Sequence, residues 1–140
     1  MIVLRWLVRL YDWVVRSDAR LSRFLLEENR FNRAQNAVKP RAFLPPSDHK
    51  LSVFGTNRLR EKSIWVIGKR VANEQNKPLY ARADLSRREL ANHKLKSVWD
   101  EPPRLHRNII GWPPHGQKDD LKLIAMELAA VATLRLYVAD

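Results

Sequence analysis

The sequence predicts an α/β fold in which a small sheet of about four short strands packs with three helices, preceded by an N-terminal amphipathic helix. The main observation is that segments with strand-like and helix-like patterns alternate from residue 51 to the end of the chain. A second observation is that 45% of the 140 residues are hydrophobic, which is sufficient for one buried core. An α+β arrangement is the alternative, because several of the predicted strands are very short.

The first segment of the chain is predicted to be the amphipathic helix. Its charged residues recur every three or four positions and share one narrow stripe, whereas Trp6, Trp13 and most other positions are large and apolar. We therefore expect a helical extension at residues 1–20 and a single α/β domain at residues 21–140. The Trp-rich face of residues 1–16 would dock on the domain itself, on a partner protein or on an anionic membrane surface.

The next segment, residues 17–48, has a less regular pattern. Residues 21–26 could form one or two further helical turns. The prolines that follow exclude a regular helix or a central strand. Residues before proline avoid helical angles, so we expect an extended loop over residues 39–46.

The hydrophobic pattern predicts the remaining elements one by one. Short apolar runs or alternating residues indicate strands, and apolar residues at every third or fourth position indicate helices. Ser86 and Glu89 have the spacing of a capping box, and Asp119 and Asp120 suit the positive end of the last helix. The predicted strands are 51–54, 79–84, 108–112 and 133–138, and the predicted helices are 60–72, 86–95 and 118–132.

The charge of the chain predicts a partner of opposite sign. The formal net charge is +11, and the first 70 residues hold 15 basic and only 6 acidic side chains. An excess of this kind is typical of proteins that bind a polyanion such as nucleic acid, although a basic surface that only aids solubility is the alternative. Lys39, Arg41 and Phe43 combine two cations with an aromatic ring, a pattern that suits the backbone and bases of a single strand. We expect three further residues to contact phosphate, namely Arg82, Arg107 and Asn108. The first functional hypothesis is therefore RNA or DNA binding.

A second hypothesis is catalytic. His106 stands close to Arg104 between two Pro-Pro pairs and next to a predicted buried strand. Imidazole transfers protons near neutral pH and guanidinium binds phosphate, so the pair would suit a metal-independent phosphoesterase or ribonuclease. Asp84 would either orient His106 or cap the helix that begins near Ser86. In the simpler interpretation, His106 hydrogen-bonds its own turn and Arg104 points into water.

Several classes of protein are not supported by the sequence. The absence of cysteine excludes disulfides and thiolate chemistry and fits a cytoplasmic protein. The four histidines lack metal-ligand spacing, and four glycines cannot form a P-loop or a dinucleotide-binding motif. We therefore expect neither a metal nor a cofactor.

Several motifs recur in the same order in a known family. Over residues 21–134 the chain resembles small bacterial proteins that have no established activity and that share Lys-Pro-x-Ala-Phe-x-Pro-Pro, Leu-Ser-Val-Phe and His-x-Asn/Asp-Ile-x-Gly-Trp-Pro motifs. The chain departs from this family at Gly55, where an arginine is usual, and at Leu105, which separates Arg104 from His106. The resemblance implies where a site lies and not what it does. The matching segments are Lys39–Pro46, Leu51–Phe54, Ile64-Trp65, Arg82–Asp84 and Pro102–Pro113.

These observations together predict a single cationic concavity. Lys39, Arg82, Arg104 and His106 all lie at or near the ends of predicted strands or in the proline-rich loop. We expect them to converge on one pocket that binds phosphate.

Overall fold

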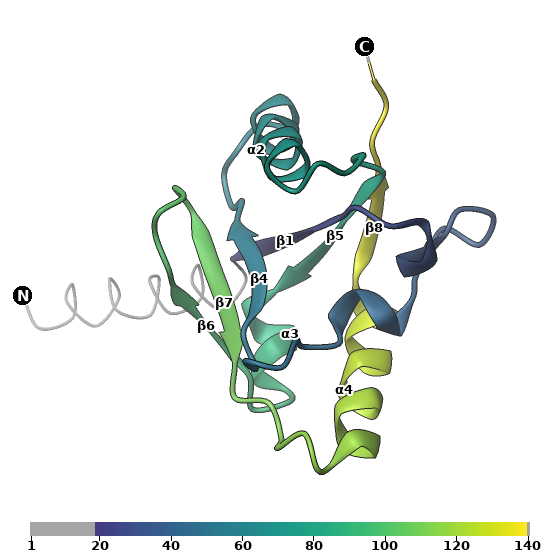
Figure 1. Cartoon of the computed structure of the whole chain (residues 1–140), viewed down its shortest axis with the longest axis vertical. Helices are drawn as coiled ribbons and strands as arrows, with labels where there is room; N and C mark the ends of the chain where they lie inside the picture. Colours follow the sequence, from purple (N-terminus) through teal and green to yellow (C-terminus); the bar gives the residue numbers. More distant parts are fainter. Residues whose placement is uncertain (1–18, 140) are drawn as a thin grey trace, which may run out of the picture.

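The computed structural model describes residues 19–139, and its centre is an antiparallel sheet with the strand order β6-β7-β4-β1-β5-β8 (Figure 1). A separate pair of short strands, β2 and β3, lies beside it. The strands of the large sheet are β1 Arg20–Leu25, β4 Leu51–Gly55, β5 Ala81–Ser86, β6 Lys96–Trp99, β7 His106–Ile110 and β8 Thr133–Leu136. The small pair consists of β2 Phe31–Asn32 and β3 Ala37–Val38.

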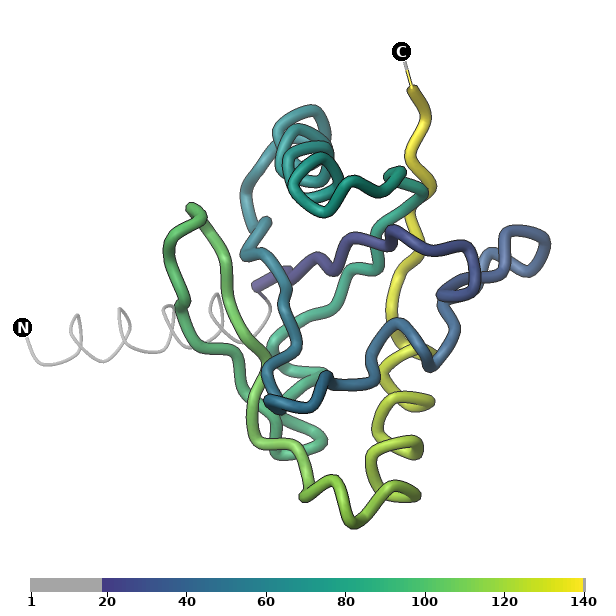
Figure 2. The backbone as a smooth tube through the Cα atoms, in the orientation of Figure 1, coloured from purple at the N-terminus to yellow at the C-terminus, as the bar shows by residue number. Residues whose placement is uncertain are grey.

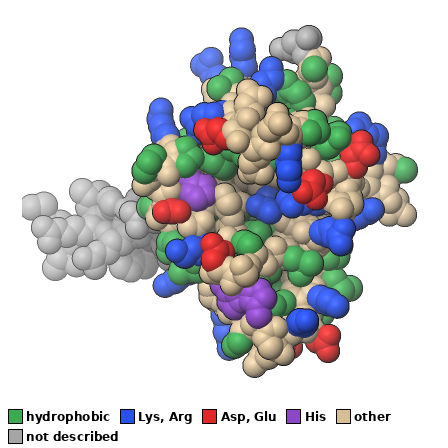
Figure 3. All heavy atoms as spheres, viewed as in Figure 1, with side chains coloured by type: hydrophobic (Ala, Val, Ile, Leu, Met, Phe, Trp, Pro, Cys, Tyr) green, Lys and Arg blue, Asp and Glu red, His purple; other side chains and the backbone are tan. Residues whose placement is uncertain are grey.

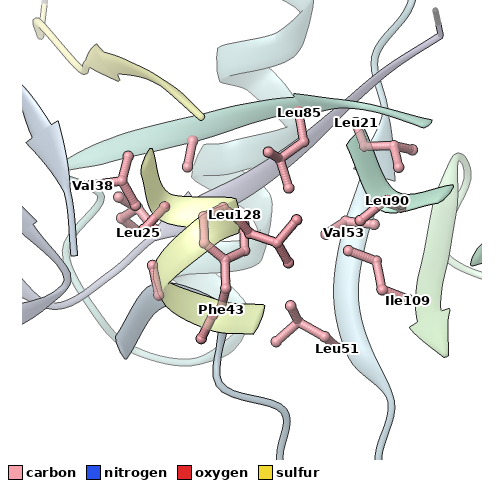
Figure 4. Packing of buried hydrophobic residues seen from close by; sticks show 14 of the residues in the cluster. Leu21, Leu25, Val38, Phe43, Leu51, Val53, Leu85, Leu90, Ile109 and Leu128 are labelled. Carbon is pink, nitrogen blue, oxygen red and sulfur yellow. The ribbon is translucent and has the colours of Figure 1, made fainter. Parts of the chain in front are cut away.

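Helices cover both faces of the sheet. The larger core lies on the face covered by α4, α3 and the 3-10 turn η2, where Phe43 and Leu128 lie among strand residues such as Leu51 (Figure 4). A smaller cluster lies under α2 on the other face and includes Phe24 and Phe54. The helices are α2 Glu61–Glu74, α3 Arg87–Ala91 and α4 Lys118–Val131, and the 3-10 turns are η1 Glu28–Arg30 and η2 Pro40–Phe43.

Gly68 determines how closely α2 approaches the sheet. A Cβ atom at this position would lie only 2.7 Å from the ring of Phe24 on β1. Such a distance is well below van der Waals contact, so only glycine allows this packing without a shift of α2 or Phe24.

The sheet is weakly joined in its middle. β1 pairs with β5 from Arg20 to Leu25, whereas its pairing with β4 is limited to Leu21 with Gly55 and Ser22 with Phe54. Beyond these pairs the two strands diverge, as the backbone trace shows (Figure 2). One half of the sheet is therefore β6-β7-β4 and the other is β1-β5-β8, and the pairing of β1 with β4 joins them.

The prediction of a mixed fold of helices and strands is confirmed. The capping box is present, because Ser86 Oγ accepts from the Glu89 N–H while Glu89 Oε2 accepts from the Ser86 N–H. The last helix ends within one residue of its expected position. The sheet has six strands where about four were expected, and the neighbouring strands of the described residues pair antiparallel.

Four strands were not foreseen, namely the short pair β2 and β3 and, in the large sheet, β1 and β6. Residues 21–26, expected as helical turns, lie largely in β1, a central strand whose two faces are both covered, so apolar residues occur on both sides and hide the alternation. The strand β6 lies at an edge, has only partly buried or exposed residues, and therefore lacks an apolar pattern. The expected helix at residues 1–20 lies almost wholly outside the described residues. Within residues 19–139, none of the helices has the length and apolar character needed to cross a bilayer.

Candidate functional site

A pocket of about 200 Å³ lies where β1 and β4 diverge. Both strands contribute to its wall, together with the end of α2 and the loop that leads into β4. Its lining includes the apolar side chains of Phe24 and Phe54 and the cations Arg23, Arg30 and Lys50. The pocket is therefore partly apolar and partly positively charged.

Arg23 occupies the gap where the β1–β4 ladder stops. Its Nη1 donates to the main-chain oxygen of Ser52 at 2.8 Å, and its Nε donates to the main-chain oxygen of Ala42. None of the ion pairs found among residues 19–139 involves Arg23. Burial, and then the positive charge of Arg30, lower the pKa of Arg23 to about 10. The guanidinium is therefore held in place by neutral carbonyls and keeps its full positive charge at neutral pH.

Arg30 adds a second cation with spare hydrogen-bonding capacity. Its Nε is buried and finds no hydrogen-bond partner in the described part of the chain. Its Nη2 lies 3.6 Å from Glu27, but Glu27 also accepts a hydrogen bond from Lys77 at 2.9 Å. The Lys77 hydrogen bond, followed by the charges of Arg30, Lys77 and Arg41, lowers the pKa of Glu27. One carboxylate is thus shared among several cations, and the pocket side retains an excess of positive charge.

Ser52 and His106 form a short hydrogen-bonded chain at the rim of this pocket. Ser52 Oγ lies 2.6 Å from Nε2 of His106, and His106 Nδ1 lies 2.9 Å from the main-chain oxygen of Asp100. A carbonyl oxygen only accepts, so we assign the imidazole proton to Nδ1, which leaves Nε2 to accept from the Ser52 hydroxyl. The Asp100 carboxylate lies 3.5 Å from Nδ1 and accepts a hydrogen bond from Asn108 at 2.8 Å. This is the arrangement of a hydroxyl, a base and a group that orients the base.

The local structure explains why these residues meet. β4 and β7 are antiparallel neighbours in which Phe54 faces His106 and Ser52 faces Asn108. The hydroxyl of Ser52 therefore reaches His106 diagonally, while the Phe54 ring meets the imidazole edge-on at 5.3 Å. Ser52 is exposed, so a ligand in the pocket can reach its hydroxyl.

A second polar cluster on the same face of the sheet is closed. Arg82 is fully buried and donates two hydrogen bonds of 2.8 Å to Glu61 and one of 3.1 Å to Asp84. Ser22 donates to Asp84 at 2.6 Å, and the guanidinium of Arg82 stacks over Trp65 at 4.7 Å. Burial acts to lower the pKa of Arg82, but hydrogen bonds and charge from Glu61 and Asp84 outweigh it and raise this pKa. Every donor group of Arg82 thus has a partner within the protein.

The structure separates most of the residues expected at one site. Asp84 hydrogen-bonds Ser22 and Arg82, and two strands separate it from the strand of His106, at about 14 Å. Arg104 lines a different pocket of about 290 Å³, between α2 and the β6–β7 connection. Lys39 lines a shallow groove beside β2. Lys39, Arg82, Arg104 and His106 therefore do not share a pocket, and helix α3 is capped by Ser86 rather than Asp84.

The other expected contact residues differ in their access to solvent. Phe43 is fully buried in the larger core, so its ring cannot stack on a base in this conformation. Arg107 is also buried, stacks on Trp99 at 4.1 Å, and has its pKa lowered to about 10 by burial and then by Arg87. Arg41 is exposed on η2, and Asn108 is buried beside Asp100. Lys and Arg side chains are distributed across the face shown in Figure 3, including its centre.

Four residues of the pocket, and Asp100 beside His106, were not foreseen from the sequence. Ser52 and Asp100 reach His106 only through strand pairing, and the Ser52–His106 contact joins residues 54 positions apart. Alternation in the Leu-Ser-Val-Phe strand places Ser52 opposite its apolar neighbours, and this was the only available signal. The remaining three are Arg23, Arg30 and Lys50.

Within residues 19–139, no three potential metal-binding side chains lie together. Comparisons of the chain with protein-family models, with curated proteins and with solved structures find no match in any of the three.

Proposed function

We propose that this chain binds RNA or DNA and that the pocket between β1 and β4 receives one phosphate group of the nucleic acid. The observation that carries the proposal is the group of three cations that line the pocket, Arg23, Arg30 and Lys50. Among residues 19–139, the hydrogen bonds of Arg23 go to carbonyl oxygens and the buried Nε of Arg30 has no partner, and Lys50 is exposed and lines the same pocket. Guanidinium groups bind phosphate oxygens through several parallel hydrogen bonds, and lysine adds a point charge.

The size of the pocket favours part of a polymer over a small molecule. Its volume of about 200 Å³ is below the range of roughly 300–1,000 Å³ that is usual for complete small-molecule ligands. A phosphate group and part of the adjoining nucleotide would fill it. The apolar side chains of Phe24 and Phe54 in the lining suit the sugar or base edge, and the exposed Arg41 near Glu27 would extend the positive surface toward neighbouring phosphates.

The experiment is a salt titration with a matched pair of variants. Fluorescently labelled single-stranded RNA, single-stranded DNA and duplex DNA are titrated with the full chain, and anisotropy gives the affinity at several salt concentrations. We expect log affinity to fall linearly with log salt concentration, because each phosphate contact releases a bound counterion. Lys50→Gln should reduce the slope by about 0.9, the value for one duplex phosphate contact. Lys122→Gln removes the same charge from the exposed side of α4 and should leave the slope unchanged.

Two results would contradict the proposal. One is the absence of affinity for all three nucleic acids at low salt. The other is an equal effect of Lys50→Gln and Lys122→Gln, which would mean that net charge alone attracts the nucleic acid and that the pocket has no special role.

A further inference from the structure

We propose that Ser52 is a nucleophile and that this site hydrolyses the phosphodiester it binds, through a covalent phosphoserine intermediate. The substrate class rests on the proposed function, whereas the activation of Ser52 rests on its own contacts. Ser52 is the residue at which the cationic pocket and the histidine chain meet, since it lines the pocket and hydrogen-bonds His106.

The first argument is the state of the imidazole. Nδ1 of His106 donates to the main-chain oxygen of Asp100, so Nε2 carries a lone pair directed at Ser52 Oγ, 2.6 Å away. This is the tautomer that a general base requires to take a hydroxyl proton. The side chain of His106 is mostly buried, with 14% exposed, and the Phe54 ring packs against it, so the imidazole has little freedom to turn away.

The second argument is the surroundings of the hydroxyl. Attack on phosphorus builds negative charge on the equatorial oxygens, and fixed cations stabilise that charge. Arg23 is bonded to the main-chain oxygen of Ser52 itself, and Lys50 lies two residues earlier in the chain and on the same side of it. These cations favour a phosphoryl centre over an acyl group, for which main-chain N–H donors are the usual oxyanion partners.

The reaction has two balanced steps. His106 Nε2 takes the proton of Ser52 while Oγ forms a bond to phosphorus, the bond from phosphorus to one ester oxygen breaks, and that oxygen receives the proton from His106. Water then gives a proton to His106, its oxygen bonds to phosphorus, and the Ser52 Oγ–phosphorus bond breaks with return of the proton to Oγ. The sum is one diester and one water converted into one phosphomonoester and one alcohol. The Asp100 carboxylate, 3.5 Å from Nδ1, would stabilise the imidazolium formed between these transfers.

The test uses a fluorophosphonate probe, which labels activated serines. Ser52 Oγ would bond to the probe's phosphorus as fluoride leaves, and peptide mass spectrometry would locate the adduct. We expect one adduct, at Ser52, and a labelling rate that falls roughly 100-fold in His106→Gln, the usual contribution of a general base. Ser63→Ala removes an exposed serine on α2 and serves as the matched control, which should label like the parent chain.

A turnover measurement accompanies the labelling. Release of p-nitrophenol from bis(p-nitrophenyl) phosphate should be lost in Ser52→Ala and retained in Ser63→Ala. Ser52→Ala should keep its thermal unfolding midpoint, because the hydroxyl is exposed and, within the described part of the chain, hydrogen-bonds His106 alone. Asp100→Asn, at a positioning residue, should lower the maximal labelling rate but not the probe concentration that gives half of that rate.

Each outcome separates the inference from the proposed function. An adduct at another serine, equal labelling of His106→Gln and the parent, or an adduct without diester turnover would overturn the inference. Salt-dependent binding of nucleic acid that persists without any adduct would leave the proposed function intact and remove the reaction. An adduct from which bound oligonucleotide gives no protection would instead contradict the placement of nucleic acid in this pocket.

Discussion

Two arginine clusters lie on neighbouring strands of the same sheet, one around Arg82 on β5 and one around Arg23 on β1, and they differ in what balances their charge. Arg82 is fully buried and bonded to two carboxylates, Glu61 and Asp84. Arg23 is bonded to two neutral carbonyl groups, and the nearby charge is mostly positive. The pKa of Arg82 is raised and that of Arg23 is lowered. The folded protein therefore stabilises the charged form of Arg82 and destabilises the charged form of Arg23.

The comparison shows how a structural cation differs from one that is held for a ligand. A buried ion pair completes its own hydrogen bonding and has nothing left to offer a partner. A partly buried cation without a counter-ion costs folding free energy, and such costs are typical of functional sites. Phe24 separates the two clusters, because it pairs with Arg82 in the sheet and also lines the pocket.

The largest expected effect is on the closed cluster. Arg82→Met leaves Asp84 buried without its cation, which should lower the free energy of unfolding by about 3–5 kcal/mol. Urea denaturation near neutral pH measures the loss. The double variant Arg82→Met/Asp84→Leu removes both charges and should recover much of it, since apolar replacement of a buried pair is often neutral. A loss below about 1 kcal/mol in the single variant would show that Arg82 is no more than a surface-type ion pair.

The next effect concerns the packing of α2 on Phe24, the residue that lies between the two arginine clusters. Gly68→Ala places a Cβ atom 2.7 Å from the Phe24 ring and should cost about 1–3 kcal/mol through forced repacking. Because Phe24 lines the pocket, the variant should also weaken nucleic-acid binding, whereas Gly116→Ala, at a position with open space around it, should change neither quantity. Unchanged stability of Gly68→Ala would mean that α2 can move away from the sheet at little cost.

The elements around these clusters differ in how far the sequence predicted them. Helix α4 was predicted closely, because its apolar residues recur with helical spacing and acidic residues mark its start. The strand β1 was missed for two reasons. Both of its faces are covered, so its apolar residues do not alternate, and Ser22 and Arg23 occupy buried or partly buried positions whose polar partners lie far away in the sequence. Local pattern therefore predicts elements that pack on one face and fails where buried polar networks replace apolar alternation.

The same reasoning applies to the site. The sequence analysis singled out His106, but its partner Ser52 is brought to it by the β4–β7 register, which no local pattern encodes. Arg82 and Phe43 have the chemical character of ligand-binding residues, yet one is paired and both are fully buried. Residue type and spacing suggest a chemistry, whereas burial and pairing decide which residues are free to perform it.

A smaller effect on stability is expected from the cations that line the pocket, Arg23, Arg30 and Lys50. Arg30→Gln removes a cation whose only ion pair, among the described residues, is a partly exposed contact with Glu27. Stability should change by less than about 1 kcal/mol. Affinity for nucleic acid should fall about tenfold, equivalent to roughly 1.4 kcal/mol, because a charge-assisted hydrogen bond to phosphate is lost. Thermal unfolding and fluorescence anisotropy measure the two quantities. The opposite pattern, with lower stability and unchanged affinity, would place Arg30 with Arg82 as a structural cation.

The smallest effect is a pH dependence of stability that comes from Glu61, the exposed partner of Arg82. Hydrogen bonds from Arg82, followed by the charges of Arg82, Arg20 and Arg135, lower the pKa of Glu61 below its usual 4.5. A carboxyl group whose pKa is lower in the folded state stabilises that state above its unfolded pKa, and this contribution is lost as the pH falls through the folded pKa. The parent chain should therefore be more stable than Glu61→Gln near neutral pH, and the difference should shrink as the pH falls below 4.5. The effect is modest because 63% of the Glu61 side chain is exposed and water screens the pair. Chemical denaturation of both proteins across the acidic range measures this difference in unfolding free energy. A difference that stays constant with pH would show that Glu61 acts through its hydrogen bonds and not through its charge.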